Sequence, residues 1–130
     1  FLREKGQNEA ARAELAKALE QDPSNSDILL DLADLDMLGG DLDAAEKMLA
    51  TVLEQQPDNR RAKQLRGIAL YKRGKFDEAE AVLLDALVLN PDPTRVHYFL
   101  GRIYENKAQP AKAAEHYREA LKKFLHETGY

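Results

Sequence analysis

The sequence predicts an all-α fold, a solenoid in which antiparallel helix pairs stack side by side, and three observations support it. Prolines recur every 34 residues, at Pro23, Pro57 and Pro91. Alanines and leucines keep the same spacing, at Ala11, Ala45, Ala79 and Ala113 and at Leu19, Leu53, Leu87 and Leu121. A repeat of this length cannot bury its own apolar face, so each repeat must stack on its neighbours.

The first element is a partial repeat over residues 1–23. Residues 1–5 are expected to be the stub of a first helix whose start lies upstream, and Gly6 is expected to turn the chain into a second helix. Ala11 would then lie on the packed face of that second helix, in register with the later alanines. Pro23 follows the helix, because proline cannot continue it.

The repeat over residues 24–57 contains both helices. Ser24 or Asn25 can cap the first helix by accepting a backbone N–H. Gly40 can end it, because glycine takes the left-handed conformation that a helix terminus often needs. Asp41 opens the second helix, where a carboxylate favours the positive end of the helix dipole. Apolar residues recur at helical spacing in both helices: Ile28, Leu29, Leu32, Ala33 and Leu35, then Ala45, Met48, Leu49, Val52 and Leu53.

The repeats over residues 58–91 and 92–125 follow the same pattern. Asp58 and Asp92 continue the spacing of Ser24, so all three are expected to cap first helices. Proline is favoured at the first position of a helix. Two residues of the last repeat are expected to open its helices in this way, Pro93 and Pro110.

Small residues mark the turns and the helix contacts. The turn position holds Gly6, Gly40 and Gly74, and Ala108 breaks this row. Helices approach each other closely only where side chains are short. The first helices supply such residues at Ala33, Gly67 and Gly101, and the second helices supply the recurring alanines.

These motifs resemble the tetratricopeptide repeat (TPR) family. The family pattern places leucine–glycine and an aromatic residue in the first helix, then alanine, an aromatic residue, alanine–leucine and proline in the second. The last repeat matches it at Leu100, Gly101, Tyr104, Ala113, Tyr117, Ala120 and Leu121. Asp36 departs from it at the aromatic position. The resemblance covers residues 1 to about 125 and implies a right-handed superhelix, with residues 126–130 as a tail.

The resemblance also implies a concave groove, lined by first helices, that binds a partner peptide or helix. Carried over by register, the lining positions are Asp27, Leu30, Asp34, Met37, Arg61, Gln64, Ile68, Tyr71, Lys72, Arg95, Tyr98, Arg102, Glu105 and Asn106. The basic set that grips a peptide's terminal carboxylate in the best-known variant is absent.

Such a groove would favour a protein or peptide partner with apolar and acidic residues, because aromatic and arginine side chains usually dominate binding. The chain would then be a scaffold, part of a larger protein or assembly. The alternative is that Tyr71 and Tyr98 only fill space between repeats.

Residue types argue against an enzyme or a cofactor site. The chain has no cysteine, which excludes a disulfide or a thiolate metal site. Its two serines, Ser24 and Ser26, lie where helix capping explains them. His97 and His116 are expected to be neighbours in the last repeat, but a metal site needs three or four converging ligands. We therefore expect packing or surface histidines, with no metal and no cofactor.

Charge is distributed unevenly along the chain, whose net charge is −4. Residues 1–20 are balanced, residues 21–59 carry one basic and ten acidic groups, and residues 60–130 carry fourteen basic and nine acidic groups. These segments therefore have net charges of 0, −9 and +5, which sum to −4. The acidic group Asp31, Asp34, Asp36, Asp41 and Asp43 lacks the spacing of a calcium loop and is interpreted as a solvated face.

A basic run over residues 60–75 supports an alternative function. It holds Arg60, Arg61, Lys63, Arg66, Lys72, Arg73 and Lys75 without an intervening acid. Such a run could bind a polyanion or a nucleic acid, but ion pairs with the acidic repeat before it are the preferred explanation. We expect no nucleic-acid partner. A further alternative is a regulatory segment of an enzyme that lies outside this sequence.

The ends of the chain and its hydropathy bear on its context. No apolar run approaches the length of a membrane span, so we expect no membrane insertion and a soluble protein of the cytoplasm or periplasm. The chain begins at Phe1 without a signal-peptide pattern, which suggests a segment of a longer array. Leu121, Phe124 and Leu125 would be partly uncovered at the far end, and end-to-end association is the alternative.

Overall fold

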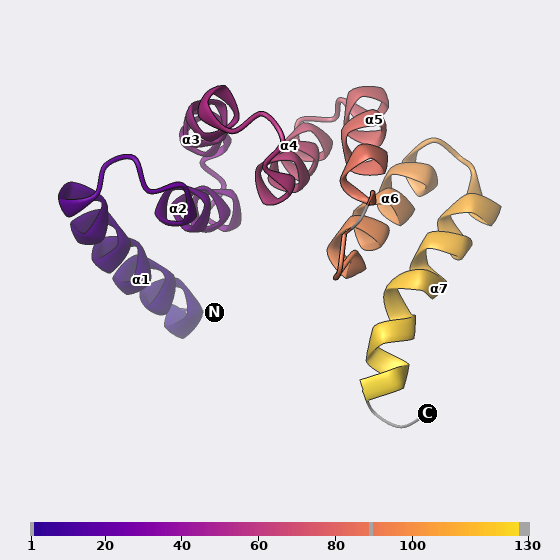
Figure 1. Cartoon of the computed structure of the whole chain (residues 1–130). Coiled ribbons are helices and arrows are strands. Elements are labelled where there is room, and N and C mark those ends of the chain that lie inside the picture. Colours follow the sequence, from indigo (N-terminus) through magenta and orange to yellow (C-terminus); the bar gives the residue numbers. More distant parts are fainter. Residues whose placement is uncertain (1, 89, 128–130) are drawn as a thin grey trace. The chain divides into compact units, whose positions relative to one another are not determined.

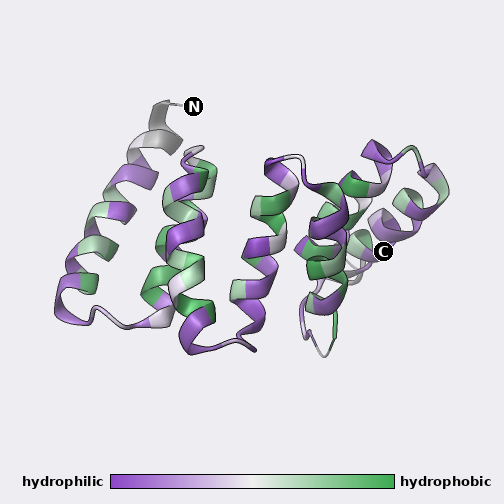
Figure 2. Cartoon of the chain, turned by 90° about the horizontal axis from the view of Figure 1, so that it is seen from above, coloured by the Kyte–Doolittle hydropathy of each residue, from purple (hydrophilic) through white to green (hydrophobic). Residues whose placement is uncertain are grey.

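The chain folds into α-helices, as predicted. The structure is a computed structural model that describes residues 2–88 and 90–127, and the side chains of residues 6–88 and 90–122. Within these ranges there are seven helices and no strand (Figure 1): α1 Leu2–Gln21, α2 Ser26–Leu38, α3 Leu42–Gln55, α4 Arg60–Lys72, α5 Phe76–Ala86, α6 Thr94–Asn106 and α7 Pro110–Glu127. Hydrophobic and hydrophilic residues alternate along these helices (Figure 2), which is the pattern of helices that pack along one side.

The helices form two compact units, residues 1–65 and residues 66–130, and the division falls inside α4. In the first unit, α1 packs on α2 and α2 packs on α3. Gly40, at φ +88°, turns the chain between α2 and α3, and the Asp41 side chain caps α3 by accepting from the Ala44 N–H. The buried apolar side chains of this unit are Leu29, Leu30, Leu32, Ala33, Met37, Ala45, Leu49, Val52, Ala62 and Leu65.

In the second unit, α5 packs on α6 and α6 packs on α7. The small residues act as predicted, because a Cβ at Gly67 would lie 2.6 Å from the Leu83 side chain and one at Gly101 would lie 2.6 Å from the Tyr117 ring. The turn into α7 uses Ala108 at φ 59°, the left-handed region that Gly74 occupies at φ 81° in the turn into α5.

Asn25, one of the two residues expected to cap its helix, caps α2, but the row Ser24, Asp58 and Asp92 was wrong by one residue. The caps are Asn25, which accepts from the Ile28 N–H at 3.2 Å, and Asn59, which accepts from the Ala62 N–H at 2.9 Å. These asparagines also stand 34 residues apart. The next position in that row is Pro93, which offers no side-chain acceptor and precedes α6 instead of opening it. Asp92 Oδ1 instead accepts from the Thr94 N–H at 3.4 Å and from the Thr94 hydroxyl at 2.8 Å.

The predicted turn at Gly6 was also wrong. Helix α1 runs through Gly6 without a break, because one glycine costs a helix only about 1 kcal/mol relative to alanine and good helix formers surround it. Ala11, expected to be packed, is exposed on α1, whereas Ala45, Ala79 and Ala113 are buried. In those repeats the alanine belongs to the second helix of a hairpin, and α1 is a single long helix.

The far end of the chain agrees in part with the prediction that it is uncovered. Leu121 is exposed, as expected. Phe124 and Leu125 lie outside the described side chains.

Candidate functional site

The predicted groove positions of the first unit are divided between surface and core. Leu30 and Met37 are buried, so they are core residues of this unit and not free anchors. Asp27 is exposed, and Asp34 and Gln64 are half-buried. Arg61 is exposed and donates through Nη2 to Asp31 Oδ1 at 2.5 Å. This ion pair joins α2 to the start of α4 and supports the preferred explanation of the basic run.

The positions of the second unit are mostly exposed. Ile68 is fully buried and Tyr71 is half-buried. The exposed positions are Lys72, Arg95, Tyr98, Arg102, Glu105 and Asn106. Most of the accessible part of the predicted set therefore lies on α6 and at the end of α4.

Aromatic rings form a continuous row in this unit, which we call the aromatic row: Tyr71, Phe99, Tyr98 and Tyr117. The Phe99 ring centroid lies 5.6 Å from that of Tyr71 and 5.1 Å from that of Tyr98, in an edge-on contact with Tyr98. The Tyr98 and Tyr117 centroids are 6.0 Å apart. Such tilted pairs are favourable geometries for aromatic rings. Tyr98 nevertheless keeps 45% of its surface exposed.

Hydrogen bonds hold the polar groups beside the aromatic row. Arg102 Nε donates to the Tyr71 hydroxyl at 3.2 Å, and this bond raises the pKa of Arg102. The Tyr117 hydroxyl donates to Glu105 Oε1, and burial together with this bond raises the pKa of Tyr117. Asn106 Nδ2 donates to the backbone carbonyl of Arg102 at 2.9 Å. The side chains that would meet a partner are thus positioned by neighbours on α4, α6 and α7.

His97 and His116 are neighbours, as predicted. Their Nδ1 atoms lie 3.0 Å apart between α6 and α7, and the His116 ring stacks on Tyr104. Burial lowers the pKa of both imidazoles, and the neighbouring ring lowers the pKa of His97 further. Among the described residues, no group of three or more His, Cys, Asp or Glu side chains is assembled to hold a metal ion.

One polar contact was missed by sequence reasoning. Asp36, interpreted as part of a solvated face, is only 5% exposed, and its Oδ1 accepts from Arg12 Nη1 at 2.5 Å. Its Oδ2 is buried without a hydrogen-bond partner, and burial raises the pKa of this carboxyl. The signal was present in the sequence as an acid at a position that is usually aromatic, but its partner lies on another helix.

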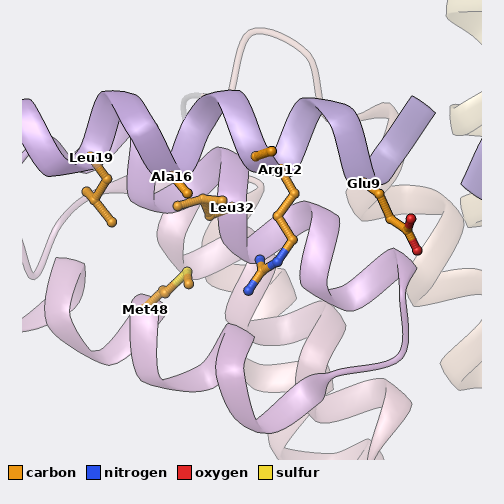
Figure 3. Close-up of a pocket in the computed structure, with 7 residues that line it drawn as sticks. Glu9, Arg12, Ala16, Leu19, Leu32 and Met48 are labelled. Carbon is orange, nitrogen blue, oxygen red and sulfur yellow. The ribbon is translucent and has the colours of Figure 1, made fainter. Parts of the chain in front are cut away.

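Arg12 also lines a cavity of the first unit, of about 380 Å³. Figure 3 shows its side chain reaching from α1 into the space between the helices, with Leu19, Leu32 and Met48 around the same space. The lining is largely apolar, and its charged residues are Glu9 and Arg12. This cavity brings together no set of groups for acid–base or nucleophilic chemistry.

Comparisons with known proteins agree with the architecture. Two family models described as tetratricopeptide repeat match residues 2–69 and residues 65–124. No curated protein matches the chain. No helix within residues 2–88 and 90–127 has both the length and the apolar composition needed to cross a bilayer.

Solved structures with the same fold include three proteins. The structure of MamA is 27% identical, with a TM-score of 0.69, and the match covers 92% of this chain and 70% of MamA. PilF of Pseudomonas aeruginosa is 30% identical, with a TM-score of 0.75, and the match covers 92% of this chain and 55% of PilF. A thermophilic TPR protein of Thermus thermophilus, 24% identical with a TM-score of 0.77, shares the fold over 92% of this chain and 68% of its own.

Proposed function

The chain belongs to the tetratricopeptide repeat family, and we propose that it is a non-enzymatic interaction module that binds a partner peptide at the aromatic row and Arg102. The observation that carries this proposal is the exposure of Tyr98, which keeps 45% of its surface open although its ring contacts Phe99 and Tyr117. Repeats of this family typically serve as protein-interaction modules, which supports a scaffold role.

The chemistry of the surface favours a peptide with an apolar or aromatic residue next to an acidic one. Tyr98 offers a rigid ring face, and tyrosines and arginines are the residue types most enriched at binding hot spots. Arg102 carries five N–H donors in a planar fork and uses Nε on Tyr71, so its fork can also pair with a carboxylate. Lys72 and Arg95, both exposed in this unit, add positive charge that would steer such a peptide.

Only part of the predicted groove set is accessible to a partner. Leu30, Met37 and Ile68 are buried, so they pack in the core and do not meet the partner. Arg61 is already paired with Asp31, which reduces the support for a polyanion-binding function of the basic run. Lys63 also forms an ion pair, with its Nζ 3.8 Å from Asp58 Oδ1. We keep the division into a partial repeat at 1–23 and repeats at 24–57, 58–91 and 92–125 as part of the proposal.

The test begins by selecting binders from a random peptide library displayed on phage, using the whole chain as bait. We expect enriched peptides that combine aromatic or apolar residues with Asp or Glu. The Tyr98→Ala/Arg102→Ala double variant should weaken their binding in fluorescence polarisation by about thirtyfold or more, the loss of about 2 kcal/mol that a hot spot carries.

Two matched variants serve as controls. Leu121→Ala removes an exposed apolar side chain outside the aromatic row, and Arg60→Ala removes an exposed cation of the basic run. Both should bind the selected peptides as the wild type does. Peptides that bind the double variant as tightly as the wild type would contradict the proposal, and a loss confined to Arg60→Ala would favour the polyanion alternative.

A further inference from the structure

We infer that His97 and His116 form a two-imidazole site for a divalent transition-metal ion of the Cu(II) and Ni(II) class. The two rings come from adjacent helices, α6 and α7, and both line a cavity of about 400 Å³ with Glu115, Arg118, Glu119 and Lys122. Neutral imidazole is the commonest metal ligand among side chains. Among the described residues that line this cavity, none belongs to the aromatic row.

The distance between the two Nδ1 atoms fits a square-planar or tetragonal ion. The two Nδ1 atoms lie 3.0 Å apart. With metal–imidazole bonds of about 2.0–2.1 Å, two nitrogens at this separation subtend about 95° at the metal. That is close to the right angle between neighbouring ligands of a square-planar or tetragonal ion, which is the geometry of Cu(II) and Ni(II) with nitrogen and oxygen ligands. A tetrahedral ion would require a wider separation.

Carboxylates of the same cavity can supply oxygen ligands. Glu119 lies three residues after His116 on α7, so both side chains share one face of the helix. Its Oε1 accepts from Lys122 Nζ at 2.8 Å. The two glutamates balance Arg118 and Lys122, so the cavity carries no net positive charge that would repel a cation.

A metal ion can replace the hydrogen bond between the two rings without changing the charge of either ring. At 3.0 Å only one Nδ1 can carry the shared proton, so at most one ring donates to the other. When the metal binds, that proton moves to Nε2 of the same ring, and both Nδ1 lone pairs become available. The stacked Tyr104 ring holds the plane of His116.

The two histidine ligands come from different helices and leave coordination positions of the ion open. No third ligand is assembled with the pair among the described residues, so water or a rotated Glu119 completes the coordination. We therefore expect an exchangeable ion that braces α6 against α7. Cu(II) should bind more tightly than Ni(II), because it stands higher in the order of divalent affinities.

The experiment titrates the full chain with CuCl₂ or NiCl₂ at pH 7.5 by isothermal titration calorimetry, with glycine as the competing Cu(II) ligand. One ion should bind for each chain, and the Cu(II) electron paramagnetic resonance spectrum should show coupling to two imidazole nitrogens. His97→Gln and His116→Gln should each weaken binding by at least about tenfold, since even residues that only support a metal ligand cost 10–100-fold when lost. His126→Gln is the matched control, because it removes the third histidine, also on α7, and should bind as the wild type does.

The wild type alone also tests the proposal, which guards against variants that fail to fold. Substoichiometric Cu(II) should broaden the ring signals of His97 and His116 in nuclear magnetic resonance spectra before those of His126. Equal affinity in the His97→Gln/His116→Gln double variant, broadening that begins at His126, or no binding below millimolar metal would each overturn the inference.

Discussion

Asp36 and Tyr104 occupy the same position of the repeat, two periods of 34 residues apart, and the contrast between them shows how one backbone geometry accommodates different chemistry. Each side chain is 5% exposed, and each reaches a partner 24 residues earlier. The Tyr104 hydroxyl donates to Glu80 Oε2 at 2.7 Å, whereas Asp36 accepts from Arg12 at 2.5 Å. The repeat thus directs a first-helix side chain onto the second helix of the preceding repeat.

The two contacts differ in how completely they satisfy their polar atoms. In the second unit, Glu80 also accepts from Lys107 Nζ at 2.7 Å, and Lys107 lies 2.6 Å from Asp77. The hydrogen bonds from Lys107 and Tyr104 lower the pKa of Glu80, while burial and the hydrogen bond to Glu80 raise the pKa of Tyr104 to about 12. In the first unit, Asp36 Oδ2 has no partner, and burial raises the pKa of Asp36 despite Arg12. A neutral donor suits this position, and a charged acceptor does not.

Moving the aspartate into the second unit should have the largest effect. Tyr104→Asp places a carboxylate beside Glu80 and removes a buried ring, so we expect a loss of about 3–5 kcal/mol in the free energy of unfolding. Urea denaturation followed by circular dichroism measures it. Tyr104→Phe, which keeps the ring, should lose only about 1 kcal/mol. Similar losses for the two variants would show that the position does not discriminate against a second acid.

Removing the cation from the first unit should have the next largest effect. Arg12→Met keeps much of the aliphatic side chain but leaves the Asp36 carboxylate buried without its partner. We expect a loss of about 2–3 kcal/mol, below the 3–5 kcal/mol of a fully buried pair, because Arg12 is 45% exposed. Urea denaturation again gives the value. Arg60→Met, at an exposed arginine, should change it by less than about 0.5 kcal/mol, and an equal loss there would contradict the assignment.

Replacing the aspartate with the residue that the middle repeat carries should stabilise the first unit. Asp36→Leu copies Leu70, removes the unpartnered oxygen, and should raise the free energy of unfolding by about 1–2 kcal/mol. Because the folded pKa of Asp36 is raised, its stability contribution is full below the unfolded value of 3.8 and is lost as pH rises through the folded value. In thermal melts between pH 4 and 7, the part of the pH dependence that comes from Asp36 should be absent from the variant. A destabilised variant would show that Arg12 outweighs the cost of burial.

The repeat and its close contacts could be predicted because they depend on residues at fixed spacing. Gly67 and Gly101 were expected where helices approach, and a Cβ at either would lie within 2.6 Å of a side chain. The caps were displaced by one residue because Ser24 and Asn25 are both competent, and only the path of the chain into the helix selects Asn25. Sequence spacing alone does not contain that path.

The candidate site could be predicted only in outline. Register alone placed Leu30, Met37 and Ile68 with the groove, but packing buries them. Neighbours on other helices decide exposure, and their side-chain volumes are not periodic. The Arg12–Asp36 contact was missed for the same reason, since its partners are joined by the fold and not by a motif. The His97–His116 contact was predicted because both residues belong to one helix hairpin.

Acidification should have the smallest effect and should act mainly on the second unit. Burial lowers the pKa values of His97 and His116 below 6.5. Their stability contribution is therefore present above the unfolded pKa of 6.5 and is lost as pH falls from there through the lower folded values. His116 and Lys122 lower the pKa of His97 further. Glu119 opposes the lowering of the pKa at both rings, and Glu115 opposes it at His116. The effect is small because both rings are half-exposed.

Hydrogen exchange at pH 7.5 and 5.5, corrected for intrinsic rates and with EDTA present to remove metal ions, separates the two units. Amides of α6 and α7 should lose protection at the lower pH. Those of α2 and α3 should keep theirs, because both histidines of the pair lie on α6 and α7 and the raised pKa of Asp36 costs the first unit no stability as pH falls. The His97→Gln/His116→Gln double variant should lose this pH dependence, because glutamine carries no titrating proton. Equal loss of protection in both units, or an unchanged response in the double variant, would assign the acid sensitivity to groups other than this pair.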